Sequence, residues 1–426
     1  MPSPAATIQP TRLPDPVEEI GSSASGEVAA PDVAETWSPP PEAEGIAPLS
    51  CDEIGEVFAY DPQAPLDIQE VGRTRKESVT VIDLTYASPM GGRVPATLVV
   101  PDGDGPFAGM LCQHGLPSTR QPVIPNAVAY ARMGAVVLLI DAPFARRADG
   151  LDMPLTFTEQ DRQEQIQLIV DLRRGVDLLL SRPEVDPKRL AYVGWSYGGR
   201  MGGLLAGVEH RLKAYVLVVG GGGLVSYMTD PERRTEWLRK PVDLRRKWVA
   251  WMWPIEPIHY VGCASPAALL FQNGTLDRSS TPADALRYQE AASEPKTVRW
   301  YRAGHGLNAA ACQDQVEWLA EMIGISVGPP AMPVDPQVLA AYAGRYHHPN
   351  GIDLTIRIDG TRVFVQIPNE PGYESVAGEY ELFASSQDRF SALMGTEITF
   401  GRNASGEVDR LVYVENGVTI EVKKIP

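Results

Sequence analysis

The sequence predicts an α/β fold, a mostly parallel sheet covered by helices, followed by a small antiparallel β domain. Short, near-continuous apolar runs recur through the middle of the chain, and most end in glycine or a polar residue. Such runs are typical of strands that are buried on both faces of a parallel sheet. Helical stretches separate the runs, and towards the C-terminus they give way to alternating strands with tight-turn signals.

Composition limits the classes of partner. The chain has 426 residues, of which 44% are hydrophobic and 22% charged, as in ordinary globular proteins. The formal net charge of −16 argues against nucleic acid and against an anionic membrane surface, because both require a basic face. No apolar run is long enough to span a bilayer, and the first residues, "MPSPAATIQPTRLPDP", lack the features of a secretory signal.

The four cysteines lie far apart and include no C-x-x-C pair; they are Cys51, Cys112, Cys263 and Cys312. We expect buried free thiols in a reducing compartment in preference to disulfides or a metal site. The predicted location is therefore cytoplasmic.

Composition also indicates the domain boundaries. Residues 1 to about 48 hold ten prolines, eight acids and only one base, so we expect a disordered or loosely draped arm. The α/β domain is expected over residues 49–326. A Pro-rich linker at 327–336 then leads to the β domain at 337–426.

The predicted strands follow in chain order. Two alternating segments joined by a "PMGG" turn come first, "ESVTVIDLTYAS" and "RVPATLVVPDG". The buried parallel strands are then "AGMLCQHG", "GAVVLLIDAP", "RLAYVGWS", "KAYVLVVGGG", "AALLFQNG" and "KTVRWYRAGHG". A long amphipathic helix is predicted at "EQIQLIVDLRRGVDLLLSR".

Candidate catalytic residues stand at the ends of these strands. Ser196 lies in "GWSYGG", after a strand and before a helix-compatible run, which is the setting of a nucleophile elbow. Trp195 precedes it, and Gly194 and Gly198 supply the space that a sharp strand-to-helix turn needs. Ligands bind at the carboxyl ends of strands in open α/β sheets.

Partners for Ser196 follow downstream in the order acid, then histidine. Asp277 comes just past the strand "AALLFQN", with Asp230 as the alternative acid, and His305 comes just past the next strand. Upstream, His114 and Gly115 end the first central strand and begin a loop whose backbone N–H groups can form an oxyanion hole.

These four motifs, in this order, resemble an α/β-hydrolase of the group that includes dienelactone hydrolases, acetyl xylan esterases and the catalytic domains of prolyl oligopeptidases. The resemblance covers about residues 75–326. Dienelactone hydrolases use a cysteine where this chain has Ser196. A prolyl oligopeptidase needs a β-propeller before its hydrolase domain, and the residues before 75 are too few for one, which disfavours peptide substrates.

The chemistry expected of this set is acyl transfer. His305 would accept the proton of Ser196, and Asp277 would hold the imidazole in the right tautomer. The N–H groups of Tyr197 and Leu116 would bind the oxyanion, with His114 shaping that loop by hydrogen bonding. We expect a carboxylic-ester hydrolase that needs no metal or organic cofactor. The alternatives are a peptidase or amidase with the same triad, and a non-catalytic protein that binds a ligand in the β domain.

Two further features bear on the substrate. An insert at about residues 222–264 holds four tryptophans, which either line an apolar acyl pocket under a cap or pack against the main domain: Trp237, Trp248, Trp251 and Trp253. Arg146 and Arg147 follow a strand end near the site. They could bind an anionic substrate, although ion-paired or solvated side chains are the favoured interpretation.

The C-terminal segment predicts a barrel or sandwich. "IDLTIRIDGTRVFVQIP" indicates a hairpin about Asp359-Gly360, with later turns at "NASG" and Asn416-Gly417. The run "LAAYAGRYHHPNG" and these strands are similar to the lipocalin-like domain appended to some serine β-lactamase-related hydrolases. His347 and His348 are expected to be a surface pair and not metal ligands. The domain would also suit a lid or the interface of a homo-oligomer.

Overall fold

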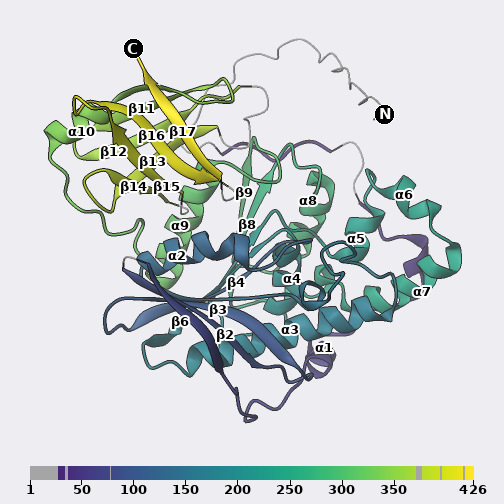
Figure 1. Cartoon of the computed structure of the whole chain (residues 1–426). Helices are drawn as coiled ribbons and strands as arrows, with labels where there is room; N and C mark the ends of the chain where they lie inside the picture. The colour runs from purple at the N-terminus through teal and green to yellow at the C-terminus, as the bar shows by residue number, and fades with distance from the viewer. Residues whose placement is uncertain (1–26, 34–36, 77, 371–376, 394–395, 416–417) are drawn as a thin grey trace, which may run out of the picture.

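The computed structural model describes residues 27–33, 37–76, 78–370, 377–393, 396–415 and 418–426. Within them the chain forms one nine-stranded sheet flanked by helices and a separate closed barrel at the C-terminus (Figure 1). The predicted architecture, an α/β domain followed by a small antiparallel domain, is therefore confirmed. Where the sequence left barrel or sandwich open, the structure shows a barrel.

The sheet has the strand order β1-β2-β3-β5-β4-β6-β7-β8-β9. The strands β1 to β3 pair antiparallel, β3 pairs antiparallel with β5, and every later pairing is parallel. The strands are β1 (Gln69–Lys76), β2 (Val79–Ala87), β3 (Arg93–Pro101), β4 (Phe107–Gln113), β5 (Ala135–Ile140), β6 (Val185–Trp195), β7 (Ala214–Val218), β8 (Ala268–Gly274) and β9 (Lys296–Tyr301).

Helices cover both faces of the sheet, and each face has its own apolar core. The residues of β4 alternate between them, since Leu111 belongs to one core and Met110 and Cys112 to the other. The helices of this domain outside the insert are α1 (Cys51–Val57), α2 (Ile124–Arg132), α3 (Glu159–Leu180), α4 (Tyr197–Ala206), α8 (Pro282–Ala291) and α9 (Ala309–Ile323). None of the described helices is both long and apolar enough to cross a membrane.

The insert at residues 222–264, which we call the cap, follows β7. It contains α5 (Leu224–Thr229), α6 (Arg234–Arg239) and α7 (Val242–Met252), followed by short 3-10 turns. In Figure 1 these helices lie at the side of the sheet opposite the barrel. The cap thus extends the carboxyl edge of the sheet, where the candidate catalytic residues lie.

The arm, which was expected to be disordered or loosely draped, is packed over part of its length. Residues 1–26 and 34–36 lie outside the described residues, but residues 37–51, which we call the strap, pack on the cap. Trp37 is buried and its Nε1 donates to Thr229 Oγ1 at 3.0 Å. Trp253 Nε1 in turn donates to the carbonyl of Ile46 at 3.1 Å. The average composition of this stretch is polar and Pro-rich, but it includes one large apolar side chain, Trp37, which packs against Trp253 of the cap.

The expectation of four free thiols is also wrong. Cys51, at the end of the strap, forms a disulfide with Cys263 in the cap, across a sequence separation of 212 residues. Only Cys112 and Cys312 are free. Two cysteines that far apart carry no sequence signal of pairing, because only the fold brings the strap against the cap.

The C-terminal barrel consists of eight antiparallel strands in sequence order, closed by pairing between the first and the last. A core of apolar side chains fills it, and Tyr342 stacks on Phe400 with ring centroids 4.1 Å apart. Its elements are α10 (Pro336–Tyr342), β10 (Gly344–His347), β11 (Asp353–Asp359), β12 (Arg362–Ile367), β13 (Gly378–Ala384), β14 (Arg389–Ala392), β15 (Glu397–Arg402), β16 (Val408–Glu415) and β17 (Val418–Ile425).

The barrel turns agree with the sequence in part. Asp359 pairs with Arg362, so the two-residue loop is Gly360-Thr361, one position later than predicted. Gly360 has φ +61°, which explains why glycine stands there. The "NASG" turn joins β15 and β16 as expected. The predicted turn at Asn416-Gly417 lies outside the described residues.

The barrel contacts the α/β domain beside α9. Leu393 is buried in the core that α2 and α9 share with the sheet, and Phe383 of β13 packs against it. At the start of α9, Ala309 lies against Gly378, where an added Cβ would be 3.2 Å from the alanine methyl. Through these contacts the barrel supports α9, the helix that follows the loop of His305.

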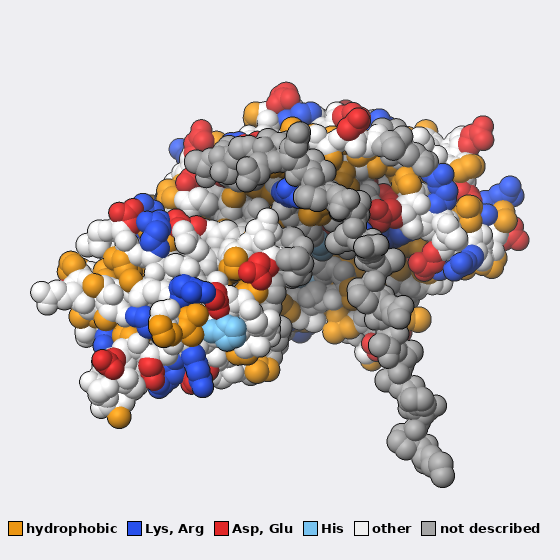
Figure 2. Space-filling model, turned by 90° about the horizontal axis from the view of Figure 1, so that it is seen from above, with side chains coloured by type: hydrophobic (Ala, Val, Ile, Leu, Met, Phe, Trp, Pro, Cys, Tyr) orange, Lys and Arg blue, Asp and Glu red, His pale blue; other side chains and the backbone are white. Residues whose placement is uncertain are grey.

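The molecular surface carries charges of both signs. Figure 2 shows acidic and basic side chains interspersed on the face seen there.

Candidate active site

Ser196 occupies a sharp turn between β6 and α4. Its backbone has φ 53° and ψ −108°, a conformation that a non-glycine residue rarely adopts. The glycines around it are required by contact: a Cβ on Gly194 would lie 2.3 Å from the carbonyl oxygen of Gly198, and one on Gly198 would lie 2.4 Å from that of Gln113. Trp195 packs partly buried against the core beside it. This geometry presents Ser196 at the carboxyl edge of the sheet.

Asp277 and His305 are joined by a hydrogen bond. The Nδ1–H of His305 donates to Asp277 Oδ2 at 2.8 Å, with Asp277 buried and His305 36% exposed. Their loops run together at the ends of β8 and β9, because the N–H of Leu276 donates to the carbonyl of Ala303 at 3.0 Å. A Cβ on Gly274 would lie 2.4 Å from that same carbonyl oxygen, so only glycine permits this approach.

The other carboxylate oxygen of Asp277 is fixed by the loop that follows. The N–H groups of Ser279 and Ser280 donate to Asp277 Oδ1 at 2.7 and 3.0 Å. Asp230, the alternative acid, is also buried but accepts a hydrogen bond from Thr281 Oγ1 and not from His305. The structure therefore brings Asp277, and not Asp230, to the histidine. Sequence reasoning did not identify Ser279 or Ser280, whose amides are recognisable only once the loop is folded.

The serine and the histidine share one edge of the sheet. Ser196 follows β6 and His305 follows β9, two strands that are separated in the sheet by β7 and β8. The N–H of Ser196 donates to the carbonyl of Val218, the last residue of β7, at 2.9 Å. In the described part of the chain no hydrogen bond joins Ser196 Oγ to His305. Such contacts are often long before substrate binds and tighten in the reactive complex.

His114 and Gly115 form the wall facing the serine. A Cβ on Gly115 would lie 3.3 Å from Ser196 Cβ and 3.8 Å from its Oγ. His114 Nε2 accepts the N–H of Ala142 at 3.0 Å, so its proton is on Nδ1, which donates to the carbonyl of Gly115 at 2.7 Å. Burial lowers the pKa of His114, which favours this neutral form. His114 therefore fixes the loop.

The two predicted oxyanion donors are the residues that follow Ser196 and Gly115 in the sequence. Tyr197 is the first residue of α4, and the first amides of a helix have no partner within it. Its side chain is buried, edge-on to Phe144 at 5.7 Å between ring centroids. Leu116 follows Gly115 and packs partly buried against the adjacent core. The role of these two amides as oxyanion donors stays a prediction.

Arg146 and Arg147 are engaged in ion pairs. Arg146 Nη1 lies 2.7 Å from Asp171 Oδ2, which is fully buried, and Arg147 Nε lies 2.8 Å from Glu164 Oε1. The favoured interpretation from the sequence, paired side chains, thus agrees with the structure.

Three of the four cap tryptophans are packing residues. Trp237, Trp248 and Trp253 are buried. The Nε1 of Trp248 donates to Asp161 Oδ2 at 2.7 Å, which ties the cap to the start of α3. Trp251 is partly exposed. Trp237 and Trp248 therefore anchor the cap, whereas Trp253 also lines a surface pocket together with Trp37.

The two adjacent histidines of the barrel have different surroundings. His347 is exposed and bonds Asp353 Oδ1 at 2.8 Å, as expected of a surface residue. His348, in contrast, is buried and its Nε2 lies 2.8 Å from Tyr413 Oη, so the expectation of a surface pair is half wrong. His347 is the last residue of β10 and His348 follows it, and the two rings have different partners. Among the described residues no group of three or more His, Cys, Asp or Glu could hold a metal ion.

Three protein-family models match segments of this chain. A family model described as acetyl xylan esterase (AXE1) matches residues 52–220, and the prolyl oligopeptidase family matches residues 157–324. A domain of unknown function (DUF3471) matches residues 328–423, the barrel.

Two solved structures share the fold. Acetyl xylan esterase 1 from Thermoanaerobacterium sp. JW/SL YS485 is 16% identical with a TM-score of 0.53, and the match covers 65% of this chain and 94% of that one. The acetyl xylan esterase from Paenibacillus sp. R4 is 19% identical with a TM-score of 0.50, covering 64% of this chain and 93% of that one. The fold and the family matches identify the chain as an α/β-hydrolase and a serine hydrolase, esterase-like in kind. This confirms the resemblance stated from the sequence.

Proposed function

We propose that the protein hydrolyses carboxylic esters through an acyl-enzyme formed on Ser196, with His305 as general base and Asp277 as its orienting acid. The observation that carries this proposal is the hydrogen bond of 2.8 Å between His305 Nδ1 and Asp277 Oδ2. It leaves Nε2 of the partly exposed imidazole for the hydroxyl of Ser196 at the same edge of the sheet.

The reaction has two halves. Ser196 Oγ attacks the ester carbonyl while His305 Nε2 accepts its proton, and the imidazolium then protonates the departing alcohol. A water molecule, deprotonated by the same imidazole, attacks the acyl-enzyme and releases the acid. The amides of Tyr197 and Leu116 are the proposed donors to the oxyanion, and each such donor typically contributes about 10²–10³ in turnover.

Esters are favoured over amides as substrates. The esterase family model spans the strand of the oxyanion loop and the nucleophile elbow, and both related structures named above are acetyl xylan esterases. Short acyl esters, acetate on a sugar hydroxyl among them, are therefore the first class to test. The prolyl oligopeptidase match over residues 157–324 keeps a peptidase as the second candidate.

The filled barrel core argues against the third alternative, a non-catalytic protein that holds a ligand inside its β domain. The described barrel strands surround packed side chains that include Tyr342, Tyr346 and Phe400. Eight strands enclose an interior that side chains can fill. The predicted homo-oligomer stays a prediction, which light scattering of the purified chain tests.

The test compares acyl and amide substrates on the same preparations. Wild type, Ser196→Ala and a control, Ser181→Ala, are assayed with p-nitrophenyl acetate, butyrate and octanoate and with aminoacyl p-nitroanilides. Ser181 is the C-cap of α3 and precedes β6, whereas Ser196 follows the other end of that strand. We expect ester hydrolysis by the wild type and the control, and a loss of about 10⁶-fold in kcat for Ser196→Ala. Cleavage of the anilides without hydrolysis of the esters would contradict the esterase proposal and support a peptidase.

The cellular location is best addressed through the disulfide. Disulfides persist in oxidising compartments and are rare in the cytoplasm, so the Cys51–Cys263 pair weighs against the predicted cytoplasmic location. The cytoplasm and an oxidising compartment are distinguished by trapping thiols with an alkylating reagent at the moment of cell lysis and then measuring the mass of the chain. Four alkylated cysteines would support the cytoplasm, and two would support an oxidising compartment.

A further inference from the structure

A buried arginine lies one helical turn beyond the proposed nucleophile. The backbone N–H of Arg200 donates to the carbonyl of Ser196 at 2.9 Å, and the residue is 3% exposed. Burying a guanidinium is costly unless it is paired and hydrogen-bonded. The hydrogen bonds and the ion pair of the Arg200 side chain therefore indicate its role.

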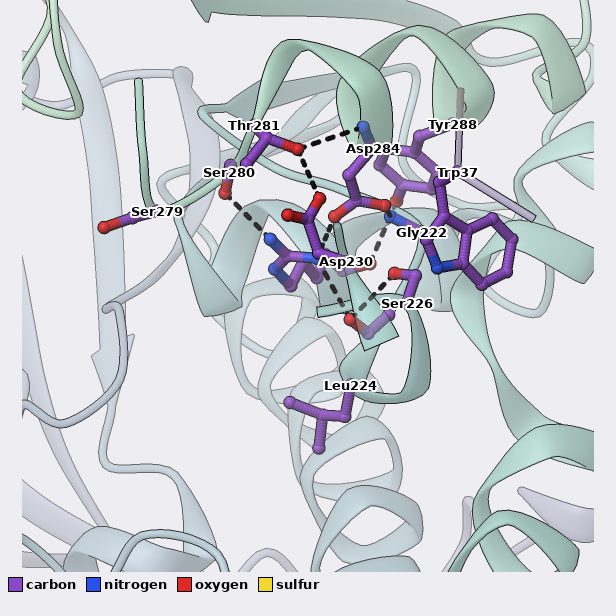
Figure 3. A network of polar contacts seen from close by, with 12 residues as sticks. Trp37, Gly222, Leu224, Ser226, Asp230, Ser279, Ser280, Thr281, Asp284 and Tyr288 are labelled. Atoms are coloured by element: carbon purple, nitrogen blue, oxygen red, sulfur yellow. Dashed lines mark hydrogen bonds and ion pairs between the residues drawn. The ribbon is translucent and has the colours of Figure 1, made fainter. Parts of the chain in front are cut away.

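The guanidinium leaves α4 and reaches the loop that carries the acid. Its Nη1 lies 2.6 Å from Asp284 Oδ2 in α8 and donates to the carbonyl of Gly223 at 3.0 Å. Its Nη2 donates to Ser280 Oγ at 2.9 Å. Figure 3 shows Ser280, Thr281 and Asp284 close together, with dashed lines marking the contacts of this network.

Ser280 connects this arginine to the proposed triad. Its hydroxyl accepts from Arg200 while its backbone N–H donates to Asp277 Oδ1 at 3.0 Å. We propose that Arg200 is a positioning residue, which ties the nucleophile helix to the Asp277 loop and so fixes the acid relative to His305. This inference rests on the proposed function and assigns Arg200 no contact with substrate.

Asp284 is held from several sides, so that it can in turn hold the arginine. The N–H of Gly222 donates to its Oδ1 at 3.0 Å, and its own N–H donates to Thr281 Oγ1 at 3.3 Å. Thr281 also donates to Asp230 Oδ2. Asp230, the alternative acid of the sequence, therefore belongs to this network through Thr281, whereas His305 is contacted by Asp277.

Buried charged groups require two glycines of the four-glycine run after β7, Gly221 and Gly223. A Cβ on Gly221 would lie 2.1 Å from Asp284 Oδ2 and 2.5 Å from Arg200 Nη1. A Cβ on Gly223 would lie 2.0 Å from Glu256 Oε2. The backbone here must approach buried charged groups directly, which any side chain would prevent.

The remaining groups around Arg200 fix its plane. The ring of Tyr227 lies under its Cζ at 5.1 Å, and Tyr288 Oη donates to its backbone carbonyl at 2.9 Å. The charged side chain facing it is Asp284, and Glu256 lies beyond, near that aspartate. A buried ion pair contributes little net stability compared with an apolar packing. The planar guanidinium of Arg200 instead sets the distance between α4, α8 and the loop that carries Asp277.

The test uses two variants that remove the connection to different extents. Ser280→Ala deletes only the hydroxyl that Arg200 contacts, and Arg200→Lys keeps the charge but cannot contact both Asp284 and Ser280. The control is Arg174→Lys, since Arg174 is equally buried and lies 2.7 Å from Asp177, on α3. Each is measured for melting temperature, kcat and KM for p-nitrophenyl acetate, and the pH profile of kcat/KM.

We expect kcat to fall about 10- to 100-fold in both test variants with KM nearly unchanged, because a displacement near 1 Å can cost that much. The acid limb of the profile should also move to lower pH, since a displaced carboxylate stabilises the imidazolium less. The double variant should lose little more than the larger single effect. Arg174→Lys should keep the wild-type kcat and profile.

Folded test variants with wild-type kcat and pH profile would overturn the positioning role while leaving the proposed function intact. Equal losses in Arg174→Lys would overturn it as well, since any buried ion pair would then suffice. A wild type that neither hydrolyses esters nor reacts with a serine-directed phosphonate would overturn the proposed function, and this inference with it.

Discussion

His305 Nδ1 lies 2.8 Å from Asp277 Oδ2, while Asp230, which is also buried, accepts instead from Thr281. The proposed roles therefore separate the two acids. Asp277→Asn should lower kcat by about 10⁴-fold, because the amide favours the wrong imidazole tautomer. Asp230→Asn keeps an acceptor for Thr281 and should lose at least 100-fold less. Steady-state ester hydrolysis measures both, and equal losses would contradict the assignment.

Gly198 should tolerate no side chain. In Gly198→Ala the new methyl would lie 2.4 Å from the carbonyl oxygen of Gln113, a backbone atom that cannot rotate away. We expect a loss of about 1–3 kcal/mol in the free energy of unfolding, measured by urea denaturation. Gly55→Ala is the matched control, since nothing lies within 4 Å of that position in α1 and alanine favours a helix. Equal stability of the two variants would contradict the described turn.

The strap should depend on its disulfide. Cys51→Ser opens the link to Cys263 and should lower the free energy of unfolding by about 2–5 kcal/mol. Cys312→Ser, which removes a free thiol, is the control. Before either variant is made, thiol titration of the denatured, unreduced protein should count two thiols, and four after reduction. A count of four without reductant would show that the pair is not formed.

Glu256 should make stability depend on pH. Burial raises its pKa from 4.5 to about 8, although the N–H groups of Leu224, Val225 and Ser226 favour the ionised form. Between these two values the folded chain retains a proton that the unfolded chain has lost. Stability from this group is therefore complete below about pH 4.5 and falls as pH rises towards 8. In Glu256→Gln the free energy of unfolding, measured by urea titrations from pH 5 to 9, should depend less steeply on pH. The same pH dependence as in the wild type would rule out this role of Glu256.

The α/β sheet and the candidate triad could be predicted because their signals are local. Each buried parallel strand is a short apolar run. Ser196 directly follows such a run, and Asp277 and His305 each lie in the loop after one. The strand β1 carries no such signal, since nearly every residue from Gln69 to Lys76 is exposed. Its place in the sheet comes from pairing with β2 alone.

The features missed by the sequence depend on contacts between distant segments. Trp37 is buried only because the cap lies over it, and Cys51 meets Cys263 for the same reason. Arg200 is one of many arginines until Ser280 and Asp284 fold around it. Burial and pairing of this kind belong to the tertiary structure, which neither composition nor periodicity encodes in one segment.

The most direct test of the account is to locate the adduct of a serine-directed phosphonate by peptide mass spectrometry. Trypsin releases Ser196 in the peptide Leu190–Arg200, "LAYVGWSYGGR", which contains no other serine. We predict one adduct per chain, on Ser196, with slow or absent labelling in a His305→Ala variant because the base is missing. A folded wild type that remains unlabelled, or that carries the adduct on another residue, would contradict the proposed role of Ser196.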